Sequence, residues 1–83
     1  MQKTYKMDKI ENRKNIGKKI AAIRNEKGWT QRQLADKCGL QQSHIARIEQ
    51  GKYSVGIDIL TTIVSALDKE IKFVDKMVEE GIG

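Results

Sequence analysis

The side chains of Gln42, Ser43 and Arg47, near the middle of the chain, are hydrogen-bonding groups. Their residue types and their spacing suit hydrogen bonds to the flat edges of nucleic-acid bases. The Gln42 amide both donates and accepts, so it can bind N6 and N7 of an adenine in a DNA major groove, and the Ser43 hydroxyl can bond to either kind of base. Arg47 follows Ser43 by four residues, which places both on one face of a helix, within reach of a guanine or a phosphate. The set predicts a surface that reads base edges.

Other kinds of site are not supported by the residue content. His44 and Cys38 are the single histidine and the single cysteine, and together they cannot supply the four ligands of a zinc site. Ser43 and His44 are neighbours, so on a helix they point about 100° apart and make no nucleophilic pair. No phosphate-binding loop, paired catalytic carboxylates or cofactor fingerprint is present. We expect no enzyme activity, no catalytic residue, no cofactor and no metal, and we expect Cys38 to be a small packing residue.

Charge along the 83 residues points to a polyanionic partner. Residues 1–27 carry nine basic and three acidic side chains, residues 28–52 carry four and two, and residues 53–83 carry three and six. The basic part therefore precedes and includes the segment with the base-reading residues, which favours nucleic acid. No apolar run approaches the roughly 20 residues of a membrane helix, and the chain starts without an apolar signal segment. We therefore expect one small cytoplasmic domain with no membrane contact.

Several helices must position these residues. Residues 1–8 have no period and predict a flexible N-terminal arm, whereas Ile16, Ile20 and Ile23 give the helical spacing i, i+4, i+7 from residue 9 onward. Gly17 lowers the expectation of one unbroken helix, and Gly28 is a suitable left-handed stop.

A tight pair of helices is predicted over residues 30–50. Thr30 and Gln33 form a capping box, and the short helix that follows ends near Lys37, before a turn at Gly39. A second helix over 41–50 is stopped by Gly51. The predicted buried residues of this pair are Leu34, Ala35, Leu40, Ile45 and Ile48.

The last third predicts one helix and one strand. A helix over about 57–67 is expected to bury Ile57, Leu60, Ile63 or Val64, and Leu67. Residues 70–75 then alternate polar and apolar, with Ile71 and Phe73 on one side, which indicates a single β-strand. A lone strand cannot satisfy its own backbone, so residues 69–83 are expected to serve dimerisation. The arm around Thr4–Met7 is a weaker partner for the strand within the chain, and helix 57–67 is the alternative dimer interface.

The segment from Thr30 to Leu67 resembles the phage-repressor/Cro-like (XRE-type) helix-turn-helix family. The matching residues are Gln31, Leu34, Ala35, Gly39, Gln42, Ser43, Ile45, Arg47, Ile48, Glu49, Gly51, Asp58, Leu60, Ile63, Ala66 and Leu67. The resemblance implies an all-α fold, a lambda-repressor-like domain of four to five helices over residues 9–68, with the short C-terminal β-strand added to it. At three places the chain departs from the pattern: Gln41 is a poor N-cap, His44 replaces a residue that is usually small or polar, and Val55 stands where proline is usual.

The resemblance also implies roles for individual residues. The positions of Gln42, Ser43 and Arg47 carry base contacts in such proteins, and that of Gln41 can touch a thymine methyl group. The position of Gln31 grips a DNA phosphate in the family and also braces the first base-reading Gln. Lys52 and Tyr53 follow helix 41–50 and are expected to contact the flanking DNA backbone. His44 is expected to contact the DNA at a phosphate or a base, or alternatively only to cover the surroundings of Leu40. Arg24 and Glu49 are expected to form a largely buried ion pair between the first and third helices, and Trp29 to pack over the seam between the first and second.

These expectations combine into a function. The leading hypothesis is a homodimeric, sequence-specific transcriptional regulator, a repressor, which reads double-stranded DNA with helix 41–50. The alternative is an antitoxin resembling the HipB or HigA type, which would bind a toxin protein as well as operator DNA. A module that binds only protein is disfavoured, since such an interface would carry aromatic and aliphatic anchors in place of Gln42, Ser43 and Arg47.

Overall fold

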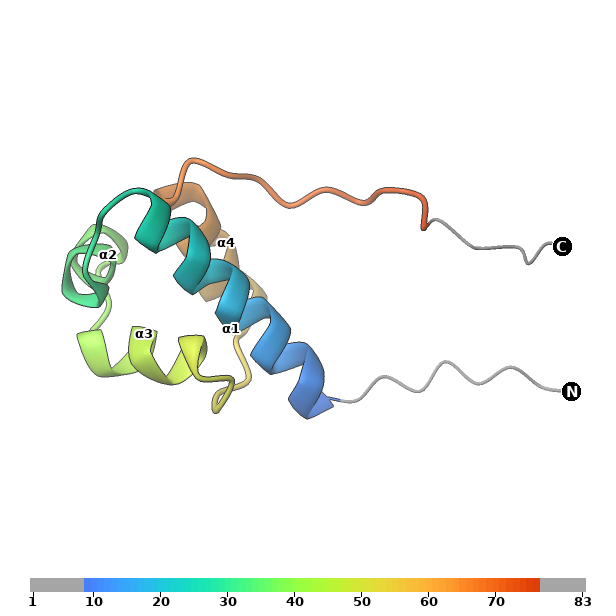
Figure 1. Cartoon of the computed structure of the whole chain (residues 1–83), viewed down its shortest axis with the longest axis horizontal. Helices are drawn as coiled ribbons and strands as arrows, with labels where there is room; N and C mark the ends of the chain where they lie inside the picture. The colour runs from blue at the N-terminus through green and yellow to red at the C-terminus, as the bar shows by residue number, and fades with distance from the viewer. Residues whose placement is uncertain (1–8, 77–83) are drawn as a thin grey trace, which may run out of the picture.

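The computed structural model describes residues 9–76 and forms four helices around one small core (Figure 1). The helices are α1 (Lys9–Glu26), α2 (Gln31–Cys38), α3 (Gln42–Glu49) and α4 (Ile57–Ala66). The predicted all-α architecture is therefore confirmed. The arm predicted over residues 1–8 and the last part of the predicted tail, residues 77–83, lie outside the described residues.

Helix α1 is unbroken, and its internal glycine has a packing role that the sequence alone did not reveal. A Cβ atom added at Gly17 would fall on the carbonyl oxygen of Ile48 and 2.6 Å from that of Glu49. Glycine therefore lets α1 approach the backbone of α3 more closely than any other residue would. The chain leaves α1 through Gly28, whose φ of 73° is the left-handed conformation expected of a helix stop.

The core lies where α1, α2, α3 and α4 meet, and α3 packs against both α1 and α2. Its fully buried members are Ile20, Leu34, Ala35, Ile45, Ile48, Ile63 and Leu67. Leu34 and Ala35 come from α2, and Ile45 and Ile48 lie one turn apart on α3, as the periodicity predicts. The position and orientation of α3 are thus fixed by apolar contacts on one of its faces.

One predicted core residue, Ile57, is not buried, because it is the first residue of α4 and 66% of its surface is exposed. Leu40 and Leu60, also predicted to be buried, are partly buried against the core. Ile16, which has the apolar spacing of α1, is 43% exposed and only partly covered by other elements. Periodicity indicates which residues share a helix face, but not how far along that face a neighbouring helix extends.

No strand forms in residues 9–76, so the strand predicted over 70–75 is absent from the described part of the chain. Residues 69–76 leave the end of α4 and run past α1 as chain without regular structure (Figure 1). The physical reason is that a strand is defined by its hydrogen-bonded neighbour, and no other described segment runs beside this one to supply a ladder. Pairing with a second copy stays a prediction.

Candidate nucleic-acid interface

The α2–turn–α3 unit is built from local signals that agree with its tertiary contacts. The backbone N–H of Gln33 donates to the Thr30 hydroxyl (3.0 Å) and the Gln33 amide oxygen accepts from the Thr30 N–H (2.8 Å), which completes the predicted capping box. At the other end of α2, Gly39 adopts φ 69°, and Leu40 then packs against the core. Helix α2 is therefore capped at both of its ends, and the turn after it begins at Gly39.

Helix α3 separates its apolar side from a polar, exposed side. Ile45 and Ile48 are buried, whereas Gln41, Gln42, Ser43 and Arg47 are all exposed. Gln41 is the N-cap residue and makes no capping hydrogen bond, so its side-chain amide is not used to close the helix. An α-helix with its side chains is about 10–12 Å across, which fits the DNA major groove at roughly 12 Å wide. The structure thus brings the four predicted base-contact residues together on one surface.

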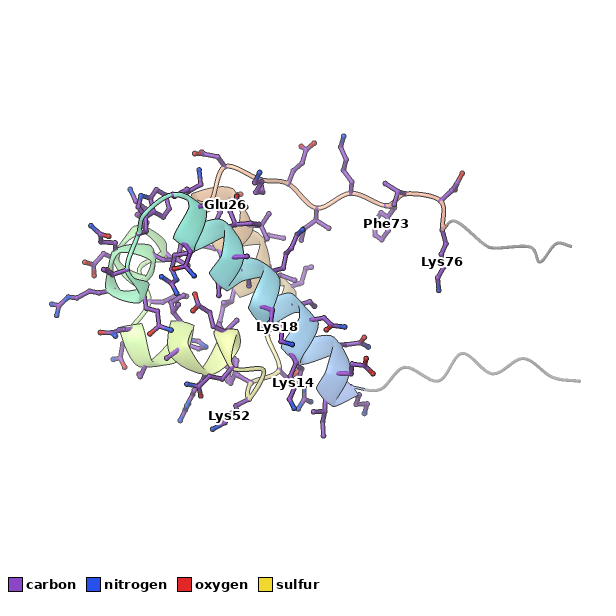
Figure 2. The ribbon with its side chains drawn as sticks, viewed as in Figure 1. Lys14, Lys18, Glu26, Lys52, Phe73 and Lys76 are labelled. Atoms are coloured by element: carbon purple, nitrogen blue, oxygen red, sulfur yellow. The ribbon has the colours of Figure 1, made fainter. Side chains whose placement is uncertain are left out.

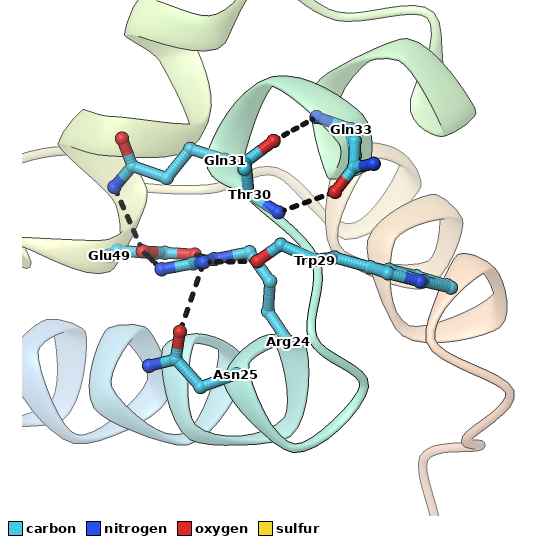
Figure 3. A network of polar contacts seen from close by, with 7 residues as sticks. All are labelled: Arg24, Asn25, Trp29, Thr30, Gln31, Gln33 and Glu49. Atoms are coloured by element: carbon cyan, nitrogen blue, oxygen red, sulfur yellow. Dashed lines mark hydrogen bonds and ion pairs between the residues drawn. The ribbon is translucent and has the colours of Figure 1, made fainter.

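The predicted ion pair joins α1 to the end of α3 (Figure 3). Arg24 Nε and Nη2 donate to the two carboxylate oxygens of Glu49 at 2.7 and 3.0 Å, the two-bond geometry that holds a guanidinium most firmly. Arg24 Nη1 also donates to the Trp29 carbonyl oxygen at 2.6 Å and to Asn25 Oδ1 at 3.1 Å. The hydrogen bond to Glu49 raises the pKa of Arg24, burial opposes it, and the charge of Glu49 adds to the rise. The side chains are only 12% and 6% exposed, so this pair is part of the interior.

Gln31, predicted to bind a DNA phosphate and to brace a base-reading glutamine, hydrogen-bonds to the ion pair in this structure. Its Nε2 donates to Glu49 Oε1 at 3.0 Å, and Figure 3 shows its amide oxygen turned away from that carboxylate. No hydrogen bond joins it to Gln41 or Gln42 in this structure, which describes both. Gln31 thus links the start of α2 to the end of α3, while one N–H of its amide stays available for a further acceptor.

His44 and Tyr53 pack against each other beside the exposed face of α3. Their rings meet edge to face with centroids 4.6 Å apart, and Tyr53 also contacts the core. His44 Nε2 is buried without a hydrogen-bond partner. The His44 ring therefore supports the loop after α3 in this structure, and its Nε2 is not turned toward a phosphate.

A lysine from α1 lies next to the loop that follows α3, and sequence reasoning missed it. The Cβ that Gly51 lacks would sit 2.8 Å from the Cα of Lys14, so the two backbones touch. Lys14 and Lys52, both exposed, consequently flank the end of α3 (Figure 2). The only sequence signal was the general excess of basic residues in the first third of the chain, because the contact joins residues far apart in the sequence.

Trp29 and Cys38 contribute packing rather than recognition. Trp29 is half-buried against the core, with the ammonium groups of Lys27 and Lys37 at 5.4 and 4.6 Å from its ring centre, which fits the seam position predicted for it. Cys38 is half-buried and unpaired, and burial raises the pKa of its thiol. In the described part of the chain no group of His, Cys, Asp and Glu could hold a metal ion. The helices of residues 9–76 are too short or too polar to cross a membrane.

Comparison with known proteins gives a consistent picture. Residues 20–74 match the Helix-turn-helix family HTH_3. The immunity repressor protein of Bacillus phage phi105 is 38% identical over 56 residues, which are 68% of this chain but only 39% of the repressor.

Solved structures share the fold over more of their length. The restriction-modification controller protein C.AhdI from Aeromonas hydrophila is 28% identical, with a TM-score of 0.71 over 72% of this chain and 91% of that protein. A chain of the HipA–HipB–O2–O3 complex has a TM-score of 0.70 over 93% of this chain and its full length, at 23% identity, which shows the fold alone.

Proposed function

Since the chain belongs to the Helix-turn-helix family, we propose that it is a transcriptional repressor that reads double-stranded DNA sequence-specifically as a homodimer. The observation that carries the proposal is the exposed polar face of α3, held in place by a fully apolar opposite face and by the Arg24–Glu49 pair. Rigid support matters because base recognition needs hydrogen-bonding groups at fixed positions relative to the groove. The relative named as a phage immunity repressor favours repression.

The base contacts are assigned to the exposed residues of α3. Gln42 pairs with an adenine through its amide, Ser43 bonds to the neighbouring base, and Arg47 reaches a guanine or the adjoining phosphate. Gln41, whose amide is not used in capping, touches a thymine methyl group with its aliphatic part. These four residues would set the operator sequence.

Backbone contacts are assigned to residues around that face. Gln31 at the start of α2 and Lys52 and Tyr53 after α3 bind phosphates on either side, and Lys14 joins Lys52 because it lies against Gly51. His44 reaches a phosphate only if its ring turns out of the contact with Tyr53. Such contacts fix the register of the protein on the duplex without specifying sequence.

The small size of helix α3, the proposed DNA-reading helix, favours a dimer. One helix of eight residues contacts few bases, so two copies on a palindromic site about one DNA turn apart, ~34 Å, would double the contacts. The segment 70–75, which has no partner strand among residues 9–76, is the proposed site of pairing.

Selection of bound sequences from a random duplex library tests the proposal. The expected result is a palindromic site on which Gln42→Ala relaxes the preference at one position per half-site and costs about 1–3 kcal/mol. Lys52→Ala is the matched control and should weaken all duplexes about equally. With ~6–10 phosphates neutralised per dimer, affinity should fall ~10³–10⁵-fold between 50 and 200 mM salt. No enriched sequence and a flat salt response would overturn the proposal.

The antitoxin alternative shares the same DNA-reading face, so this experiment does not separate it from a repressor. The similarity to a chain of the HipA–HipB–O2–O3 complex supports the fold, but it does not identify a binding partner for this protein. A toxin gene beside this one would be the discriminating observation, followed by co-purification of the two products.

A further inference from the structure

A small pocket lies between the start of α1 and the loop that follows α3. Its apolar lining residues are Ile16, Ile48, Val55 and Leu60, and its polar lining residues are Asn12, Arg13, Tyr53 and Ser54. Its volume is about 190 Å³, which is below the roughly 300–1,000 Å³ of pockets that enclose a small-molecule ligand. The pocket therefore suits a chemical group of a few atoms.

The polar side chains of this pocket suit an anion. Each of the four can donate a hydrogen bond, and among the described residues that line the pocket Arg13 carries the only charge. Arg13 is half-buried, and within residues 9–76 no ion pair or hydrogen bond joins its guanidinium to another residue. A guanidinium in this situation can bind a phosphate group through two charge-assisted hydrogen bonds.

The pocket lies beside the proposed DNA-reading helix. Tyr53 lines the pocket, and its ring meets the ring of His44 on α3 edge to face, with centroids 4.6 Å apart. Because His44 precedes the exposed Arg47 by one turn, the loop that carries Tyr53 flanks one edge of the polar face of α3. A helix about 10–12 Å across fills a major groove of roughly 12 Å, so each edge of α3 lies close to one sugar–phosphate strand. The strand at this edge would pass the pocket.

Helix α1 takes part because it continues beyond the end of α3. It touches the following loop where the Cβ that Gly51 lacks would sit 2.8 Å from the Cα of Lys14. Residues 9–13 therefore lie past the last turn of α3 (Figure 1). The exposed Lys14 and Lys52 add positive charge beside Arg13 (Figure 2).

We propose that this pocket holds one DNA phosphate per subunit: the Arg13 guanidinium forms two hydrogen bonds to it, and the Tyr53 and Ser54 hydroxyls donate to it. The inference rests on the DNA binding of the proposed function and gives the start of α1, outside the α2–turn–α3 unit, a part in it. The contact carries no sequence information, but it fixes the register of α3 on the duplex.

Duplex binding measured by fluorescence anisotropy at several salt concentrations tests the role of Arg13. Arg13→Gln should raise the Kd about 10- to 100-fold, on the selected site and on random duplexes alike, because it removes charge-assisted hydrogen bonds. The slope of log Kd against log salt should fall by about 1.8 per dimer, since two phosphate contacts are lost. Lys37→Gln is the matched control, because Lys37 lies over the Trp29 ring and not at this pocket, and it should change neither quantity.

A pair of variants at Ser54 tests the same pocket without changing Arg13. Ser54 is exposed in the loop, so neither substitution removes a core contact, and urea unfolding of each variant checks the fold. Ser54→Asp places a carboxylate beside the phosphate and should weaken DNA binding about tenfold or more. Ser54→Asn has nearly the same shape without the charge and should weaken binding less than about threefold.

Neutral methylphosphonate linkages locate the phosphate. In a series of duplexes that each carry one such linkage per half-site, the wild type should lose affinity at the position that the pocket contacts. Arg13→Gln should lose little at that same position, because the charge that Arg13 binds is already absent. At all other positions the two proteins should respond alike.

Several results would overturn the proposal. They are an Arg13→Gln protein with the Kd and salt slope of the wild type, equal losses for Ser54→Asp and Ser54→Asn, or an Arg13→Gln loss that no methylphosphonate position removes. Calorimetric binding of inorganic phosphate through Arg13, with DNA affinity independent of Arg13, would assign the pocket to a free anion and also overturn it. A wild type that binds no duplex would overturn the DNA-reading function itself, whereas a palindromic site bound equally by wild type and Arg13→Gln would leave that function standing.

Discussion

Replacing Glu49 by glutamine should destabilise the domain strongly, although the two side chains have almost the same shape. The carboxylate is 6% exposed and accepts both Arg24 bonds as well as the one from Gln31. Glutamine keeps one acceptor and points an NH₂ group at a donor, so it leaves the Arg24 charge buried without a counter-charge. Breaking a buried pair in this way costs about 3–5 kcal/mol. We expect a value near the lower end, because Arg24 keeps its bond to the Trp29 carbonyl oxygen.

A loss of about 3–5 kcal/mol would be a large share of the domain's free energy of unfolding. At ~0.05–0.15 kcal/mol per residue, a chain of this length has a free energy of unfolding of about 4–12 kcal/mol. Urea unfolding followed by circular dichroism measures the change as a shift in midpoint at constant slope. Asp68→Asn is the matched control, since it also turns a carboxylate of an ion pair into an amide, and asparagine tolerates the positive φ of 60° at that position. Asp68 is 82% exposed and 3.4 Å from Lys27, so this change should cost less than about 1 kcal/mol.

A double variant separates charge burial from packing. Arg24→Met with Glu49→Met removes both charges and keeps apolar bulk, so it should be more stable than either single methionine variant. The reasoning is refuted if Glu49→Gln costs no more than Asp68→Asn, or if the double variant loses the sum of the two single losses. Either result would mean that the pair is solvated in solution.

Three further perturbations test separate parts of the fold. Gly17→Ala should destabilise the domain by about 1–3 kcal/mol, because the alanine Cβ would meet the Ile48 carbonyl oxygen. Helix propensity alone predicts the opposite, a stabilisation of ~1 kcal/mol. The sign of the change in the urea midpoint therefore decides between the steric clash and helix propensity. Thr30→Ala removes one bond of the capping box and should cost about 1 kcal/mol in the same assay, and no change would show that α2 does not depend on its cap. Burial raises the pKa of the Cys38 thiol, so a smaller fraction of it is thiolate at a given pH. Iodoacetamide should therefore label the native protein more slowly than the urea-unfolded protein across pH 7–9. Equal labelling rates would show that the thiol is accessible and its pKa unshifted.

Much of the fold could be predicted from the sequence because it depends on local chemistry. The capping box at Thr30, the left-handed stops at Gly28 and Gly39 and the burial of Ile45 and Ile48 each need only residues within a few positions of one another. These local signals determine where each helix begins and ends and which side of it is apolar. These local signals also predict which residues of α3 are exposed, because the residues on the side opposite Ile45 and Ile48 are polar.

The pairing of Arg24 with Glu49 was expected from a family resemblance, and its geometry came only with the structure. Only the structure shows that Lys14 touches Gly51 and so lies beside the candidate DNA-binding surface, and that the Gln31 amide hydrogen-bonds to Glu49. Each of these contacts links positions separated by at least 18 residues. Their existence depends on how the helices cross, which no local pattern encodes.

The apolar pattern of the sequence determined that Ile16 and Phe73 belong on apolar faces. The tertiary structure decided that Ile16 is only partly covered and Phe73 fully exposed among residues 9–76. Periodicity reports the side on which a residue lies, since it reflects the average environment of a helix or strand. Whether a second element reaches that side depends on helix lengths and crossing positions. For the strand predicted over 70–75 it depends on a neighbouring strand, because a β-strand exists only through hydrogen bonds to a neighbour, and residues 9–76 provide none.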